Sequence, residues 1–332
     1  MEVLDVVAEH QHRYAPYRYI IIANAILAVP LNILAAYLII FKSPKNLKTY
    51  RYILLNITFW VFLTDVMVEI FFLPQSRLEI FAVYATGLAS SLSPECGFIL
   101  LVLSAYCFGQ YLVALLFAFF YRYQALRQTT YFCCMELVDR HFWVAIAALM
   151  IVPPGTILAG ITISYSPYNE FKTYALQVKL APYFGAVPIF GVDKTRFLIG
   201  CGTILIWAIL WIIAVALCIR GIVNQFRAHR AMFSEYTYRL HMQLMKALVV
   251  QTAAPLGLFV VPLAVDMVGL IFLPNIMNDA IVLTELALSL HSTVNSVAVI
   301  VLIAPYRKAA VSLFYKVYSS HASVAPVHVA AS

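Results

Sequence analysis

Five ionisable side chains lie within stretches of the sequence that are otherwise strongly apolar: Asp65, Glu69, Asp266, Glu285 and His291. Charged groups are costly inside a membrane, and those found there usually face a bundle interior or a cavity. Asp65 and Glu69 are four residues apart, so they share one face of a helix. We therefore predict that these five residues form a polar pocket for a small ligand.

Simpler interpretations of the same residues stay open. The cluster could hold only internal water and ions. Glu69 and Glu285 lie near the ends of their apolar stretches, so their side chains could simply reach toward water. His291 and Asn295 are four residues apart, and such pairs often serve only as hydrogen bonds between packed helices.

The composition shows which elements must carry these residues. The chain has 332 residues, of which 63% are hydrophobic and 11% are charged, with a mean hydropathy of +0.88. Soluble domains are less apolar and more highly charged. About 20 apolar residues cross the hydrocarbon core of a membrane, and such segments must be helical to satisfy their backbone groups. Seven spans are predicted, at about 19–41, 52–72, 97–120, 141–164, 197–218, 247–272 and 280–304.

We therefore predict an all-α fold, a seven-transmembrane helix bundle. Its parts are an extracellular segment at 1–18, a transmembrane domain at 19–316 and a short disordered cytoplasmic tail at 317–332. Pro153 and Pro154 in the fourth span, and Pro255 and Pro262 in the sixth, should kink their helices.

The basic residues predict the orientation of this bundle. Of the 22 Lys and Arg residues, 15 lie on the side that holds the C-terminal tail, and 7 lie on the other side. Cytoplasmic loops carry the excess of Lys and Arg, so we expect the N-terminus outside and the C-terminus in the cytoplasm. The basic face predicts contact with anionic membrane lipid and cytoplasmic partners, not with nucleic acid.

Aromatic and basic residues gather at the inner ends of the spans. They are Tyr121, Arg122 and Tyr123 after the third span, Arg227 and Arg230 in the third inner loop, and Pro305, Tyr306 and Arg307 after the seventh. Such residues commonly anchor helix ends at the headgroup region. The alternative is that they form a switch between the bundle and a cytoplasmic protein.

The six cysteines are scattered and lack zinc-binding spacing, so neither a metal site nor another cofactor is expected. Cys96 and Cys201 are predicted at the outer ends of spans 3 and 5, where they could form a disulfide. Cys133 and Cys134 fall in the second inner loop, where palmitoylation is plausible.

Several segments resemble nematode serpentine chemoreceptors of the Str superfamily, in particular the Srh, Sri and Srd families. The similar segments are 43–60, 119–123, 243–255, 291–292 and 304–307. They occur in the same order as in that superfamily and extend over nearly the whole chain. Pro94-Glu95-Cys96 departs from the Gly-Pro-Cys that Srd-like receptors tend to carry before the third span.

This resemblance implies a G-protein-coupled receptor in the plasma membrane of sensory neuron cilia. Its partners would be a small odorant or soluble cue and a heterotrimeric G protein. Arg122 then matches the span 3 arginine of rhodopsin-like receptors, with Tyr121 in place of the preceding acid. Pro305 and Tyr306 match their span 7 proline–tyrosine motif.

A small membrane transporter or channel is the alternative function, although the sequence has no internal repeat of the kind many transporters show. A retinal protein would need a lysine in the last span, and residues 280–304 contain none. An enzyme would need a nucleophile–base pair or clustered metal ligands, which the spans do not suggest.

Overall fold

The computed structural model describes residues 2–44, 48–77, 82–91, 93–127, 152, 155–166, 189–228, 230, 234–272 and 277–322. Within this part of the chain, six helical stretches are long and apolar enough to cross a membrane: Pro16–Lys42, Tyr50–Phe72, Glu95–Ala125, Lys194–Ala228, Tyr238–Leu270 and Asp279–Leu302. They coincide with predicted spans one, two, three, five, six and seven. A shorter apolar helix, Gly155–Ser164, lies within predicted span four.

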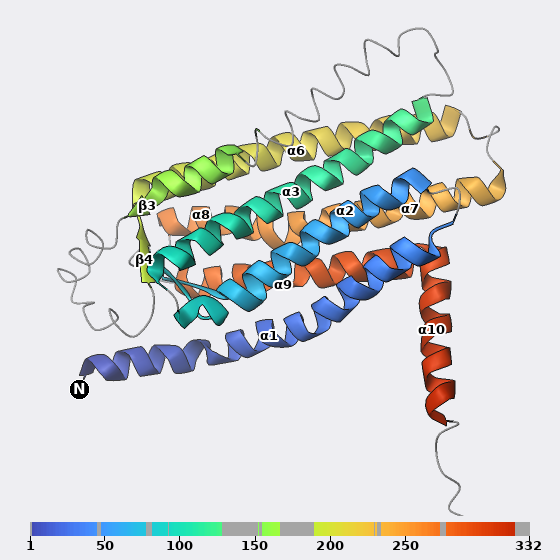
Figure 1. Cartoon of the computed structure of the whole chain (residues 1–332). Coiled ribbons are helices and arrows are strands. Elements are labelled where there is room, and N and C mark those ends of the chain that lie inside the picture. The colour runs from blue at the N-terminus through green and yellow to red at the C-terminus, as the bar shows by residue number, and fades with distance from the viewer. Residues whose placement is uncertain are drawn as a thin grey trace, which may run out of the picture.

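These stretches belong to longer elements that lie side by side (Figure 1). The elements are α1 (Glu2–Lys42), α2 (Lys48–Asp65) with the π-helical segment η2 (Val66–Phe72), α3 (Pro94–Arg127), α6 (Lys194–Ala228), α7 (Glu235–Pro255) with the π-helical segment η7 (Leu256–Val260) and α8 (Val261–Phe272), and α9 (Met277–Leu302). The all-α bundle predicted from the sequence is confirmed.

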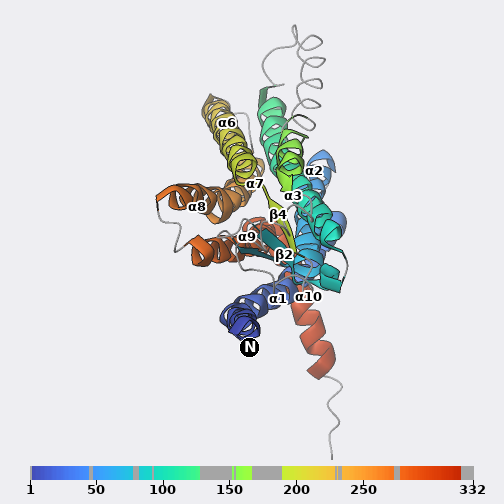
Figure 2. The ribbon, with the colours of Figure 1, turned by 90° about the vertical axis from the view of Figure 1, so that its left-hand side faces the viewer.

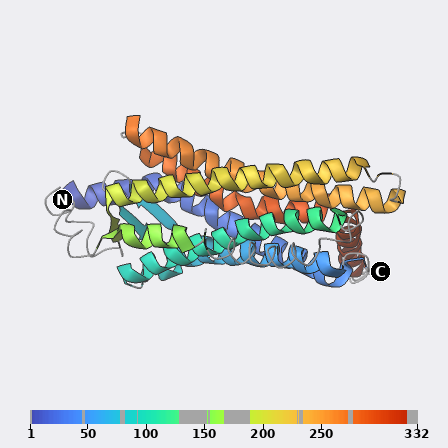
Figure 3. The same ribbon diagram turned by 90° about the horizontal axis from the view of Figure 1, so that it is seen from above.

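Two π-helical segments interrupt the spans that the structure describes. η7 follows Pro255 directly, where a kink was predicted, because proline cannot donate the usual helical hydrogen bond. Beyond η7, α8 leans away from the other helices (Figures 2 and 3). η2 was not predicted. It ends at Leu73, which has a left-handed backbone (φ 41°) and whose N–H donates to the Val68 carbonyl at 2.7 Å, the five-residue spacing of a π-helix.

A small antiparallel sheet covers one end of the bundle and was also not predicted. Its strands are β1 (Pro74–Arg77), β2 (Ala82–Ala85), β3 (Tyr165–Ser166) and β4 (Ile189–Val192), in the order β1-β2-β4-β3. Phe190 of β4 packs into a buried cluster with Phe72, Ala85 and Phe98, which fixes the sheet to η2 and α3. We call this end of the bundle the sheet end, and Figure 2 shows β2 and β4 there.

The opposite end carries α10 (Ala304–Ala322), which turns away from the direction of the bundle after a bend at Ile303 (Figure 1). We call it the α10 end. Pro305 lies just beyond the end of α9, in the first turn of the new helix, where proline is well tolerated. Residues 317–322 therefore continue a helix, in contrast to the disordered tail predicted from 317 onward.

Candidate functional site

A cavity of about 360 Å³ lies toward the sheet end, between α2–η2, α3, the helix Gly155–Ser164, α6, α8 and α9. Most of its wall is apolar. All six of these elements, together with η7, supply large side chains to it: Phe72, Leu101, Phe108, Leu112, Ile157, Trp207, Trp211, Phe259, Leu263 and Leu288. Aromatic and aliphatic walls of this kind are typical of small-molecule sites.

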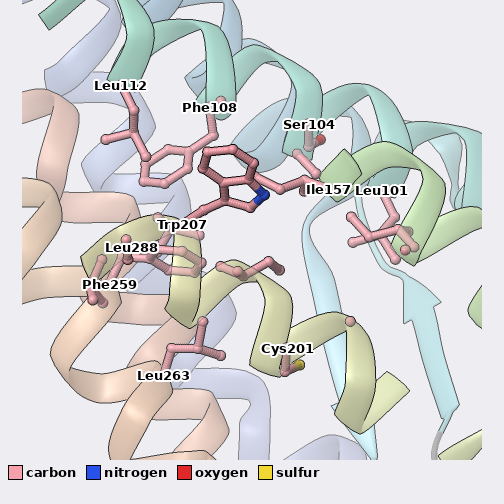
Figure 4. A pocket seen from close by; sticks show the side chains of 18 of the residues that line it. Leu101, Ser104, Phe108, Leu112, Ile157, Cys201, Trp207, Phe259, Leu263 and Leu288 are labelled. Carbon is pink, nitrogen blue, oxygen red and sulfur yellow. The ribbon is translucent and has the colours of Figure 1, made fainter. Parts of the chain in front are cut away.

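Trp207 of α6 occupies the middle of the close view in Figure 4, beside Phe108 of α3 and facing Phe259 and Leu288. The rings of Phe108 and Phe259 meet edge to face, with centroids 4.9 Å apart. Trp211, one turn further along α6, donates a hydrogen bond from Nε1 to the Leu112 carbonyl at 2.9 Å. This bond joins α6 to α3 along the cavity wall.

The cavity also has polar positions. Asp266 of α8 is only 3% exposed and accepts a hydrogen bond from Thr284 of α9 at 2.6 Å. Glu285 accepts hydrogen bonds from Tyr17 of α1 at 2.9 Å and from Ser76 of β1 at 2.6 Å. Among the described residues that line the cavity there is no lysine, arginine or histidine.

The capping residues explain how two of the wall helices are positioned. Ser93 precedes α3, and its Oγ lies 3.4 Å from the Cys96 N–H, while Pro94 occupies the first helical position. Asp193 precedes α6 and accepts a bond from the Arg196 N–H at 2.9 Å. Both patterns favour a helix start at that point.

The five residues predicted as one pocket fall into separate places. Asp266 and Glu285 line the cavity, whereas Asp65, Glu69 and His291 do not. His291 lies behind the wall, with its ring 5.5 Å from that of Phe108, a wall residue. Its Nδ1 contacts the Leu288 carbonyl.

Asp65 and Glu69 belong to a buried polar network between α1, α2–η2 and α9. Asn32 of α1 donates to Asp65 Oδ2 at 3.0 Å and to Ser292 Oγ at 2.8 Å, and Ser292 also bonds to Asp65. The side-chain oxygen of Asn32 accepts a hydrogen bond from Ser296 at 2.7 Å. Asn32 therefore bonds to both neighbouring helices at once.

Glu69 continues this network toward the sheet end. Its Oε1 accepts a hydrogen bond from Asn24 of α1 at 2.9 Å. Asn24 also donates to the Ser289 carbonyl and accepts from Thr293, each at 2.9 Å. Asp65 and Glu69 thus face α1 together, as their four-residue spacing requires, and hold α1 and α9 against span two.

A second chain of polar contacts crosses the middle of the bundle. Tyr111 of α3 packs against His291, with ring centroids 5.6 Å apart, and donates from its hydroxyl to the Gln251 carbonyl at 3.0 Å. The Gln251 side chain of α7 donates to Asn295 of α9 at 2.8 Å. These contacts connect the back of the cavity wall to α7.

The α10 end contains most of the residues predicted as a switch. Arg122 is 5% exposed, so it does not extend to the headgroup region. Its guanidinium lies 3.9 Å from the centre of the Tyr50 ring and donates to His241 Nδ1 at 2.8 Å. Because arginine can only donate, this ring nitrogen of His241 must be unprotonated. Among the described residues, no carboxylate pairs with Arg122.

The flanking aromatics are also packed. Tyr121 stacks on Tyr50 at 6.4 Å between ring centroids. Tyr123 lies against Gly221 of α6, where a Cβ atom would come within 2.7 Å of the Tyr123 ring. This site on α6 therefore requires glycine if α3 and α6 are to keep their present spacing.

Tyr306 is fully buried, and its hydroxyl lies 2.7 Å from Ser43 Oγ at the end of α1. Burial raises the pKa of the Tyr306 phenol, so the hydroxyl stays protonated and available for this bond. Arg307 bonds to the Val301 carbonyl at 2.9 Å. Arg227 and Arg230 are exposed, and Arg230 lies over the Tyr238 ring at 5.7 Å.

The predicted disulfide is not present, because Cys96 and Cys201 are both free thiols. Cys201 is buried in the cavity wall on α6. Cys96 lies in the first turn of α3, with its sulfur 3.6 Å from Ser93 Oγ. The predicted palmitoylation sites, Cys133 and Cys134, lie outside the described residues.

Several residues of these sites were not singled out from the sequence. Trp207, Phe108 and Phe259 are apolar residues in apolar spans, so nothing in their type separates a cavity wall from a lipid-facing surface. Tyr50 and His241 are distant from Arg122 in sequence, and only the packing of α2 and α7 on α3 brings them to it.

Comparison with known proteins gives one family. The family model described as "Serpentine type 7TM GPCR chemoreceptor Srh" matches residues 14–316. A search among curated proteins found no relative of the chain.

Proposed function

Because the chain belongs to the Srh family of serpentine seven-transmembrane chemoreceptors, we propose that it is a chemosensory receptor that binds a small molecule and activates a heterotrimeric G protein. The family is a receptor class, which disfavours an enzyme and also the transporter or channel that the sequence left open. The observation that carries the ligand half of the proposal is the apolar cavity toward the sheet end, with its two carboxyl groups.

The proposed orientation places the sheet end outside the cell and the α10 end in the cytoplasm. The excess of Lys and Arg on the α10 side supports this orientation. The receptor then lies in the plasma membrane, and the ligand reaches the cavity from the extracellular side. The G protein docks at the cytoplasmic end, near Arg122, Arg227 and Arg230. The neuronal cilium is the membrane we propose for a chemoreceptor of this family.

Two routes could connect the ligand cavity with the docking face. Phe108 forms part of the cavity wall and packs on His291, which in turn packs on Tyr111. The Tyr111 hydroxyl bonds to Gln251 of α7, the same helix that carries His241. A second route follows α7 itself, because η7 and α8 line the cavity at the other end of that span. A ligand shifts such a system only through its different affinity for the two states.

The contact between Arg122 and His241 is our proposed switch. It joins α3 to α7 at the α10 end without an acidic partner, so its strength depends on a neutral histidine acceptor and on the Tyr50 ring. Parting α7 from α3 would expose the arginine to a docking protein. Buried polar contacts of this kind stay intact only while the helices around them keep their spacing.

The test is to express the chain with an N-terminal tag in cells that carry a promiscuous G protein and a calcium reporter. A panel of volatile and water-soluble metabolites is then applied, and the tag is read on unpermeabilised cells. We expect a surface tag and a calcium signal that depends on at least one compound. A tag that appears only after permeabilisation, on protein shown to be at the plasma membrane, would reverse the orientation.

Arg122→Ala should lower this signal while the surface tag is unchanged. Arg51→Ala is the matched control, because it removes a positive charge near the same end of the bundle from a residue that contacts its neighbour Tyr52. If Arg122→Ala and the parent receptor give equal signals, Arg122 is not part of the site that couples to the G protein.

A further inference from the structure

The cavity chemistry points to a class of ligand. We infer that the receptor binds a small apolar molecule that carries one basic amine, with the amine placed against Asp266. This inference rests on the proposed function, since it takes the cavity as the ligand site. It stands on three features of the described residues: the apolar walls, the two carboxyl groups without a cation, and an unpartnered hydroxyl on α3.

The walls determine the body of the ligand. Aromatic rings from α3, α6 and η7 surround the space, as Figure 4 shows for Phe108, Trp207 and Phe259. A cavity of about 150 Å³ with apolar walls is enough to hold benzene. The present cavity of about 360 Å³ therefore accepts an aromatic ring together with a short side chain.

The carboxyl groups determine the charge of the ligand. Asp266 is almost fully buried, and the one side chain among the described residues that donates to it is the neutral Thr284 hydroxyl. Within the described part of the chain, Glu285 is likewise bonded only to neutral hydroxyls, those of Tyr17 and Ser76. Among the described residues neither carboxyl group has a basic partner. A carboxylate buried without a cation is costly, and a cation supplied by the ligand would offset that cost.

Ser104 adds a further polar position on the α3 side. It lines the cavity, is 6% exposed, and its Oγ has no hydrogen-bond partner among the described residues. A buried hydroxyl without a partner costs free energy, so a polar ligand atom that reaches it is favoured. Ser104 can either donate to or accept from a ligand.

The same charges exclude an opposite class. A ligand with a carboxylate group would meet two acidic side chains and, among the described lining residues, no basic one. Like charges in a site of low dielectric repel strongly. Carboxylic acids of similar size and shape should therefore bind weakly, and neutral alcohols should fall between the two.

The experiment compares three probes with a common phenyl group: 2-phenylethylamine, 2-phenylethanol and 3-phenylpropanoate. Binding to the purified full-length receptor in nanodiscs is measured at pH 7 by isothermal titration calorimetry, with empty nanodiscs as the blank. We expect the amine to bind at least about tenfold more tightly than the alcohol, a difference of ~1.4 kcal/mol. We expect no measurable binding of the carboxylate.

Asp266→Asn keeps the size of the side chain and its ability to accept from Thr284, and it removes the charge. The amine and the alcohol should then bind within about threefold of each other. Asp279→Asn is the matched control, because Asp279 is exposed at the start of α9 and does not line the cavity, so it should keep the selectivity of the parent receptor.

Each alternative result counts against the inference. Binding of the carboxylate as tight as that of the amine would overturn it, and so would an Asp266→Asn receptor that keeps the preference for the amine. Absence of binding by all three probes would also overturn it. If Asp266→Asn does not fold, the order of the three probes on the parent receptor remains the test. Failure of the calcium assay together with selective amine binding would instead refute only the G-protein proposal.

Discussion

Replacing Asn32 with alanine tests whether the polar network holds α1, α2 and α9 together. Asn32 is 1% exposed and makes three inter-helix side-chain hydrogen bonds, two as donor to Asp65 and Ser292 and one as acceptor from Ser296. Hydrogen bonds between membrane helices average about 0.6 kcal/mol each, with a maximum near 1.7. The three bonds together therefore contribute roughly 2 kcal/mol, with an upper bound of about 5.

The assay is thermal unfolding of the purified full-length receptor in detergent. A loss of 1 kcal/mol lowers the Tm by about 2–4 °C in domains of 150–250 residues, and longer chains fall toward the lower value. Asn32→Ala should therefore lower the Tm by about 4 °C. Ile33→Ala is the control, because the next residue is 57% exposed on the outer face of the same helix, and it should change the Tm by much less.

A double-mutant cycle separates the hydrogen bonds from general packing. Asn32→Ala and Ser296→Ala share one bond, so their combined effect should be smaller than the sum of the two single effects. An Asn32→Ala receptor with a Tm within about 1 °C of the parent would refute the reasoning. So would two single effects that add fully.

Three further predictions concern the two ends of the bundle. Gly221→Ala should lower the Tm, because its Cβ would lie 2.7 Å from the Tyr123 ring, and adding Tyr123→Ala should recover most of the loss; no recovery would contradict the close packing. Tyr306→Phe removes the bond to Ser43, worth about 1 kcal/mol, and should shift the half-maximal ligand concentration in the calcium assay by up to about fivefold; an unchanged curve would exclude this bond from coupling. Cys201→Phe should fill part of the cavity and weaken 2-phenylethylamine binding at least about tenfold at unchanged surface expression; unchanged binding would place the ligand elsewhere.

The sequence was sufficient for six of the seven predicted spans, because their apolar stretches are long and their ends carry charge; much of the fourth lies outside the described residues. It was sufficient for the family as well, because several short segments lie in the right order along the chain. It could not reveal η2, since Val66–Phe72 contains no proline to mark the irregular turn. Nor could it reveal the sheet, whose strands have only two to four residues each and whose central pair, β2 with β4, joins segments that are far apart in the sequence.

The candidate site was only partly accessible to sequence reasoning. Charge inside a span marked Asp266 and Asp65 equally, and their different surroundings depend on helix packing: one faces a cavity and the other faces Asn32. Arg122 was recognised by its position, but its surroundings were not, because Tyr50 and His241 come from other helices. The prediction of a disordered tail was wrong for residues 317–322, because small residues such as Ser319 and Ser320 suggested disorder where α10 continues.

The hydrogen bonds to Glu285 give the cavity a thermodynamic connection to the outer surface of the bundle. Tyr17 and Ser76 both bond to this carboxyl group, so it ties α1 and strand β1 to α9 across more than 200 residues of sequence. A cavity ligand that takes up the Glu285 oxygens must compete with these two hydroxyls. Coupling between sites is reciprocal, so a protein that binds β1 and holds Ser76 in place would lower the affinity for that ligand by the same factor. An antibody fragment raised against the sheet would then act as a negative modulator of the receptor without entering the cavity.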